Sequence, residues 1–145
     1  MLILLLIAGA LVCGTVFVHA VGTAAWVHHL RALVRDDEPH SFFWVLGILA
    51  QTALVLILLH MIEILLWATT YYLLPETGVA SFEESIYFSC ATFTTLGYGD
   101  VTLEPPWRLL TGVEALNGVL LIGWSTALSF AVIQASLNRS VSPRP

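Results

Sequence analysis

The sequence predicts an all-α integral membrane protein with three transmembrane helices and a shorter fourth helix that enters the bilayer and turns back. Only 10% of the 145 residues are charged and 58% are hydrophobic, whereas a soluble domain is about 25% charged. The mean hydropathy is +0.88. The apolar residues form three long runs, residues 2–30, 42–74 and 107–137. Each run is long enough to cross a hydrocarbon core of about 30 Å.

The first run, within residues 1–34, is expected to be an additional N-terminal transmembrane helix. It contains no charged side chain before Arg31. A cleaved signal peptide is the alternative, because Val18-His19-Ala20 weakly resembles a cleavage site. No basic residue precedes the apolar run, however, and the run is long for a signal peptide. A retained helix is therefore the favoured interpretation.

The arginines predict the orientation in the membrane. Arg31 and Arg35 follow the first run, and Arg139 and Arg144 follow the third. The positive-inside rule places the first connection and the short tail, residues 138–145, in the cytoplasm. The N-terminus and residues 75–106 are then outside, in a multi-pass protein of the plasma or inner membrane. The net charge of −5 leaves no basic face, so a nucleic-acid partner is not expected.

The outer segment contains a helix too short to span. Ser81 followed three residues later by Glu84 forms a capping box, which predicts that a helix begins at residue 82. The apolar stretch ends at about residue 93, after roughly a dozen residues. A helix of this length beside full spans is typical of a re-entrant segment. Non-helical backbone at that depth is tolerated only inside protein or along a water-filled path, so the next residues are expected to line a polar path.

Those next residues, 94–100, read Thr-Thr-Leu-Gly-Tyr-Gly-Asp. This string resembles the signature of the tetrameric potassium-channel pore, in which valine is commoner at the position of Leu96. The resemblance implies a pore domain over residues 42–137. Its parts are an outer helix (42–74), a pore helix (82–93), a selectivity filter (94–100) and an inner helix (107–137). It further implies a homotetramer around a central pore and passive conduction of K⁺.

Elementary chemistry agrees with this resemblance. A dehydrated cation needs oxygen dipoles in place of water, and backbone carbonyls supply them without a titratable charge. Carbonyls that all point the same way require alternating backbone conformations, and Gly97 and Gly99 accept positive φ without a Cβ clash. The expected K⁺ sites lie at Thr95, Leu96, Gly97 and Tyr98, with Gly99 completing the filter. The expected partners are K⁺, the lipid bilayer and other copies of the chain, and no cofactor is expected.

Neighbouring residues are expected to support the filter. Tyr98 should turn away from the pore and pack against Tyr87 or Phe88, and Asp100 should brace the outer end. Some members of the family pair this Asp with a Glu of the pore helix, but Ala91 stands at that position here. The remaining supporting residues are Thr94 and Glu114.

The outer segment also carries most of the acidic side chains. In a tetramer they would give about twenty carboxylates at the outer mouth, enough to concentrate cations there. A solvated loop with helix-capping acids is an equally good interpretation. The five residues are Glu76, Glu83, Glu84, Asp100 and Glu104.

The third run contains candidates for gating. Gly118 or Gly123 is expected to be either a hinge or a point of close helix packing. Small polar side chains are expected to line the inner cavity. Intramembrane Glu114 is interpreted as a brace hydrogen-bonded to the pore helix, with a protonation-linked gate and a lipid-facing position as alternatives. The cavity candidates are Ser125, Thr126 and Ser129.

The second run contains one intramembrane charge, Glu63, three residues after His60. We interpret the two as a hydrogen-bonded pair that also reaches His19 or Thr15, so that the first run packs against the second. Proton sensing is the alternative, and two residues are too few ligands for a metal.

Other side chains in the sequence carry weaker expectations. Three further histidines near the inner membrane face are candidates for pH sensing, although exposed histidines without a role are more common. The two cysteines, which lie far apart in apolar runs, are expected to be small buried hydrophobes. The histidines are His28, His29 and His40, and the cysteines are Cys13 and Cys90.

The sequence contains no arginine-rich voltage sensor and no catalytic spacing of nucleophile and base, so we expect a channel and not an enzyme. A potassium-selective channel is the favoured function. A weakly selective cation channel and a non-conducting membrane scaffold or accessory subunit are the alternatives. A potassium transporter would carry several filter-like loops, and this chain has one.

Overall fold

A computed structural model describes residues 1–33 and 41–141 of the chain, with side chains described as far as residue 136. Arg35, His40 and the last residues of the predicted tail, 142–145, lie outside the described residues. The described chain forms four helices and no strand: α1 (Leu2–Leu33), α2 (Phe42–Leu73), α3 (Phe82–Phe93) and α4 (Arg108–Val141). The fold is therefore all-α, as the composition predicted.

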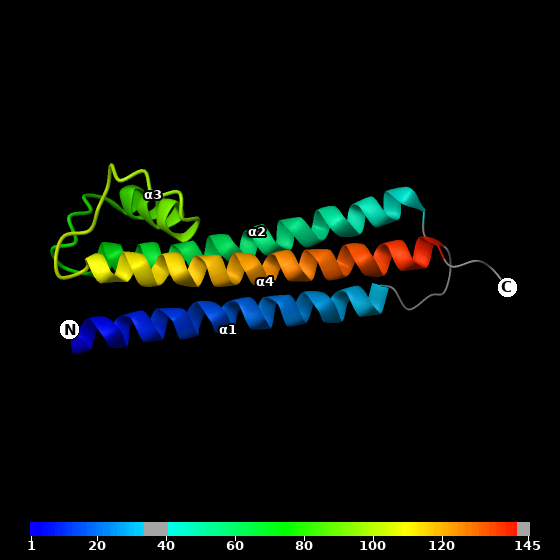
Figure 1. Ribbon diagram of the computed structural model, residues 1–145, viewed down its shortest axis with the longest axis horizontal. Coiled ribbons are helices and arrows are strands. Elements are labelled where there is room, and N and C mark those ends of the chain that lie inside the picture. Colours follow the sequence, from blue (N-terminus) through cyan, green and yellow to red (C-terminus); the bar gives the residue numbers. More distant parts are fainter. Residues whose placement is uncertain (34–40, 142–145) are drawn as a thin grey trace.

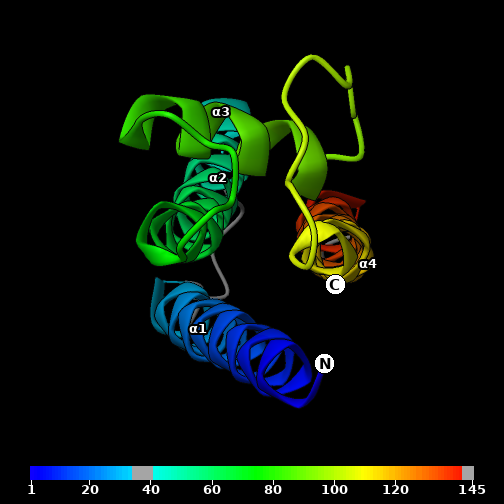
Figure 2. The ribbon, with the colours of Figure 1, turned by 90° about the vertical axis from the view of Figure 1, so that its left-hand side faces the viewer.

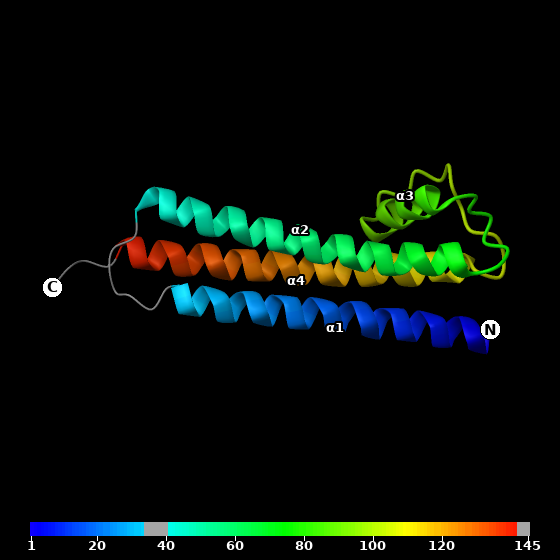
Figure 3. The same ribbon diagram turned by 180° about the vertical axis from the view of Figure 1, so that it is seen from behind.

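Three long helices lie side by side, and the short helix α3 sits against one end of them (Figure 1). The view from behind shows the same arrangement, with the N-terminus at the end that carries α3 and the end of α4 at the opposite end (Figure 3). Seen along the bundle, α3 rests on the α2–α4 pair and α1 lies on the other side of that pair (Figure 2). The N-terminus and α3 thus lie at the same end of the bundle, as expected if both are on one side of the membrane.

The three long helices are each long and apolar enough to cross a membrane. Many of their large apolar side chains are exposed in the single chain, among them Phe17, Leu54 and Leu120. An apolar run in lipid does not need to be buried in protein, since lipid tails accept it. The same reasoning corrects the expectation for Cys13 and Cys90, which are both exposed.

The helix ends follow from local sequence. Ser41 caps the start of α2 by accepting from the Trp44 amide. The helix ends at Leu73 because Pro75 forces extended backbone on Leu74, whose ψ is 138°. At the other end of the chain, α4 continues to Val141, so residues 138–141 of the predicted tail are helical. No proline or glycine interrupts the sequence between Leu137 and Pro143, which explains why the helix runs on.

Helix α1 packs against both α2 and α4. A Cβ at Gly22 would collide with the side chain of Leu59, so the α1–α2 approach depends on that glycine. The Asn117 amide of α4 donates to the Thr15 hydroxyl of α1 over 2.7 Å. These contacts confirm that the first run packs on the second, and they add α4 as a second neighbour.

Candidate functional site

The site begins with the cap of α3. The Ser81 side chain accepts from the Glu84 amide over 3.1 Å, as the capping box predicted. The Glu84 carboxylate in turn accepts from the Ala80 amide, one residue earlier than in the usual reciprocal pair. The acidic first turn is stabilised by the positive end of the helix dipole, and the negative end of the dipole lies at the Phe93 end.

The chain leaves α3 through hydrogen bonds that fold residues 94–97 back onto the helix end. Thr94 is the C-cap, and its hydroxyl donates to the Cys90 carbonyl over 2.7 Å. The Thr95 amide donates to the Thr92 carbonyl over 2.9 Å, and the Gly97 amide donates to the Ala91 carbonyl over 3.1 Å. These hydrogen bonds therefore fix the start of the 94–100 segment to the C-terminal end of α3.

The backbone of the segment alternates in conformation. Thr95, Gly97 and Gly99 have positive φ values of 60°, 54° and 81°. No atom lies within 4 Å of a Cβ built on either glycine. Glycine is therefore favoured at these two positions by the positive φ and not by a lack of space for a side chain. The sequence pointed to the two glycines, but nothing in it marked Thr95, a β-branched residue that rarely enters the left-handed region.

Asp100 closes the C-terminal end of the segment. Its carboxylate accepts a 2.7 Å hydrogen bond from the Tyr87 hydroxyl of α3. This bond lowers the pKa of Asp100 below its usual value and raises the pKa of Tyr87, because it stabilises the carboxylate and the neutral phenol. Tyr87 thus supplies from α3 a side-chain hydrogen bond to Asp100.

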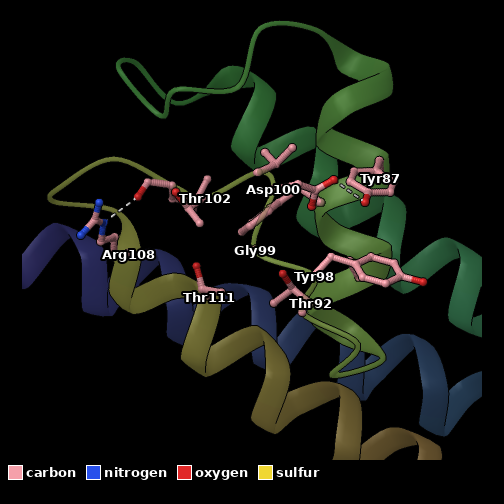
Figure 4. A pocket seen from close by; sticks show the side chains of 13 residues that line it. Tyr87, Thr92, Tyr98, Gly99, Asp100, Thr102, Arg108 and Thr111 are labelled. Atoms are coloured by element: carbon pink, nitrogen blue, oxygen red, sulfur yellow. Dashed lines mark hydrogen bonds between the residues drawn. The ribbon is translucent and has the colours of Figure 1, made fainter.

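The aromatic packing differs from the expectation for Tyr98. Tyr98 is 69% exposed, and its ring points away from Thr111 and Arg108 of α4 (Figure 4). Among the described residues it makes no ring contact with Tyr87 or Phe88. Phe88 instead packs edge-on against Tyr71 of α2, with ring centroids 5.2 Å apart. The reason is that one face of α3 must cover α2, and Phe88 lies on that face.

A cavity of about 460 Å³ lies between the segment, α3 and the start of α4. Figure 4 shows Asp100 and Tyr87 on one wall and Arg108 and Thr111 on the other. The Arg108 guanidinium donates to the Leu103 carbonyl over 3.0 Å. This bond holds the loop of residues 101–107 against the start of α4.

Beneath this cavity, Glu114 of α4 joins three helices. Its two carboxylate oxygens lie 2.6 Å from the Tyr71 hydroxyl of α2 and 2.5 Å from the Ser89 hydroxyl of α3. Ser89 also lies 3.0 Å from the Ile64 carbonyl. Glu114 is fully buried. The hydrogen bond to α3 agrees with the brace interpretation, whereas the part played by Tyr71 was not recognised in the sequence.

The two glycines of α4 have different surroundings. A Cβ at Gly118 would collide with the carbonyl oxygen of Phe93, the last residue of α3. Close packing is therefore the reason for glycine at that position. Gly123 has no atom within 4 Å of such a Cβ. A hinge at either position stays a prediction.

The three hydroxyls expected in the inner cavity point in different directions. Ser125 is buried, and its hydroxyl lies 2.9 Å from Nε2 of His60, so it faces α2 and not an open cavity. Thr126 is exposed and Ser129 is half-buried, and each hydroxyl donates to the carbonyl four residues earlier. The helical spacing of these residues could not distinguish the two faces.

The acidic side chains of the outer segment are exposed except Glu84, which is half-buried at the start of α3. Arg108 is engaged with the Leu103 carbonyl and forms no ion pair with them in the described structure. The acids therefore present uncompensated negative charge around the 94–100 segment. The exposed members are Glu76, Glu83, Asp100 and Glu104.

Comparison with known proteins places this geometry in a family. A family model described as "Ion channel" matches residues 59–135, which is more than half of the chain. The match begins within α2, covers α3 and the 94–100 segment, and ends near the end of α4, so α1 lies outside it. No curated protein and no solved structure gives a significant match. The chain belongs to this ion-channel family, whose pore is of the tetrameric potassium-channel type.

Proposed function

We propose that the protein is a potassium-selective channel that conducts K⁺ passively through the backbone carbonyls of residues 95–98. The observation that carries the proposal is the alternation of positive φ at Thr95, Gly97 and Gly99. Alternation between positive and negative φ turns successive carbonyls toward one side of an extended segment. Such a row of oxygens replaces the hydration shell of a cation that must also leave again.

A row on one chain is only one wall of a pore, so the function requires several chains around an axis. Two side chains of the segment support this assembly. Leu96 is 57% exposed and Tyr98 is 69% exposed in the single chain, and both are large enough to need cover. We propose that neighbouring subunits of a homotetramer supply that cover, with the four segments facing one another.

The proposed orientation places α3 and the N-terminus outside, and the end of α4 in the cytoplasm. It rests on four arginines. Arg31 and Arg139 lie in the last turns of α1 and α4, at the end of the bundle far from α3, and Arg35 and Arg144 follow them in the sequence. The exposed acids of the outer segment then surround the outer mouth and raise the local cation concentration.

Flux into liposomes that contain only this protein tests the proposal. We expect uptake of K⁺ and no uptake of Na⁺ when each is the sole permeant cation. Gly97→Ala, which forces a Cβ onto positive φ, should abolish selective K⁺ flux. Gly9→Ala is the matched control, because Gly9 lies in α1 with open space around its Cβ position. Unchanged K⁺ flux in Gly97→Ala would refute the carbonyl row.

The same measurement separates the two alternative functions. Equal flux of K⁺ and Na⁺ would identify a weakly selective cation channel on the same fold. Absence of flux for either ion, at every pH between 4 and 8 on both sides, would identify a scaffold or accessory subunit. A cross-linking ladder of the detergent-solubilised protein that ends at four chains is the expected result for the assembly.

A further inference from the structure

Two histidines and a glutamate meet inside the bundle, outside the 94–100 segment. Nδ1 of His19 in α1 and Nδ1 of His60 in α2 each lie 2.8 Å from a different oxygen of the Glu63 carboxylate. The two imidazole rings are stacked, with centroids 5.4 Å apart and planes inclined by 26°. His19 and Glu63 are fully buried, and the His60 side chain is 18% exposed. We call these three residues the histidine–glutamate cluster.

We propose that the histidine–glutamate cluster is a binding site for a divalent first-row transition metal, with Zn²⁺ as the ion of choice. Each of the three residues offers a ligand atom, and the three atoms lie within 4.8 Å of one another. Two imidazole nitrogens and a carboxylate oxygen form one of the ligand sets that zinc uses in proteins. The ion would tie α1 to α2, and with three protein ligands the fourth position of a tetrahedral zinc would be left open.

The charge of the cluster favours a cation. Within the described structure, the ion pairs of Glu63 are made with the two histidines. An ionised carboxylate between neutral imidazoles leaves a net negative charge in a bilayer interior, which is costly. In the structure each ring hydrogen-bonds through Nδ1 to one oxygen of this carboxylate. A metal ion that took the place of the two shared hydrogens would be held by both rings and the carboxylate together.

The surroundings of the cluster are those of a metal site. On the far side of both rings, Nε2 of His60 and Nε2 of His19 lie 2.9 Å and 3.4 Å from the Ser125 hydroxyl of α4. A ligand histidine usually donates its second N–H to such an acceptor, which fixes its tautomer and orientation. With both Nδ1 atoms bound to a metal, both Nε2 atoms would carry the hydrogen, and the two lone pairs of the hydroxyl oxygen would accept from both rings.

Aromatic side chains close the cluster against water. The Trp124 ring stands edge-on to His19 at 5.4 Å, and the Phe93 ring lies 5.7 Å from His60. A dry shell strengthens the attraction between the ion and its ligands. The His60 side chain is 18% exposed, so the cluster is not completely enclosed in the single chain.

Zinc binding by the purified full-length protein tests this proposal. The protein is stripped with a chelator in detergent, dialysed against buffered micromolar Zn²⁺, and its zinc content is measured per chain. We expect one Zn²⁺ per chain in the wild type and a rise in Tm on binding. His60→Gln and Glu63→Gln should each weaken binding at least about tenfold. Co²⁺ in place of Zn²⁺ should give the visible absorption of a low-coordinate site.

His28→Gln combined with His29→Gln is the matched control, because both histidines are exposed at the far end of α1. Circular dichroism and gel filtration confirm that each variant is folded. Failure of the folded wild type to take up Zn²⁺ would overturn the proposal, and a Tm that then varied with pH would identify a proton site. Binding that disappears with His28 and His29 but survives His60→Gln would overturn it as well. Zinc content is independent of ion flux, so neither result decides whether the protein conducts K⁺.

Discussion

The Tyr87 hydroxyl donates a 2.7 Å hydrogen bond to the Asp100 carboxylate, and this bond connects the middle of α3 with the residue after Gly99. The 94–100 segment is thus held at both ends by the same helix. At its inner end the Thr95 and Gly97 amides donate to carbonyls of α3, and at its outer end Asp100 accepts from Tyr87. The helix that precedes the segment is therefore also its support.

Removal of the Tyr87 hydroxyl should change how external acid affects conduction. The bond lowers the pKa of Asp100, so the ionised brace is present above that pKa and is lost as external pH falls through it. In Tyr87→Phe the pKa returns toward its usual value, and acid block of the K⁺ current should begin at a higher pH. Current across a planar bilayer, recorded while the pH of each side is lowered in turn, measures the midpoint.

Tyr72→Phe is the control for this experiment, because the exposed Tyr72 ring packs on Phe82, the first residue of α3. Its midpoint should match that of the wild type. The same midpoint in Tyr87→Phe would contradict a supporting role for the Tyr87–Asp100 bond.

Truncation of Glu114 should destabilise the protein more than its conversion to an amide. Glu114→Ala leaves the fully buried Tyr71 hydroxyl without its acceptor, which costs about 1–3 kcal/mol. Glu114→Gln keeps an oxygen for Tyr71 and an amide that donates to Ser89. Thermal unfolding of both variants in one detergent compares them, and equal Tm values would show that the carboxylate does not join the helices.

The two glycines of α4 should respond oppositely to alanine. Gly118→Ala pushes a methyl group into the Phe93 carbonyl and should reduce the free energy of unfolding by about 1–3 kcal/mol. Gly123→Ala has open space and should gain up to about 1 kcal/mol from helix propensity. Unfolding monitored by circular dichroism measures both, and a stabilised Gly118→Ala would refute the close contact.

The hydrogen bond between Asn117 and Thr15 should couple α1 to α4 by about 1 kcal/mol. A double-mutant cycle with Thr15→Val and Asn117→Leu measures this coupling from the four unfolding free energies. A second cycle pairs Thr15→Val with Thr70→Val, because the Thr70 hydroxyl donates within α2 to Leu66. In the second cycle the effects of the two substitutions on the unfolding free energy should add. If they also added in the first cycle, the Asn117–Thr15 hydrogen bond would contribute nothing to stability.

The helices were predictable from the sequence because lipid requires long uninterrupted apolar runs, and because Ser81 and Pro75 mark helix ends. An intramembrane carboxylate needs a partner, so the sequence indicated a link from the His60–Glu63 pair to His19 or Thr15. The structure shows His19 on Glu63, whereas Thr15 accepts from Asn117. The link from Tyr71 to Glu114 was not foreseen, because a tyrosine near the end of a membrane span is commonly found at the membrane–water interface.

Contacts between residues distant in the sequence were the least predictable part of the site. Asn117 and Thr15 are 102 residues apart, and no local pattern pairs them. The face to which Ser125 points depends on the rotation of α4 about its axis, and that rotation is set by Gly118 against Phe93. Thr95 takes its left-handed conformation from the hydrogen bond of its amide to Thr92, which propensity alone would oppose.

The contact of Gly118 with Phe93 has a mechanical consequence. Helices separated by side chains can slide, because rotamers yield and absorb small displacements, but here backbone touches backbone. Sideways motion of α4 at this level would therefore displace Phe93, the residue that precedes Thr94, with no side chain between the two backbones to absorb the shift.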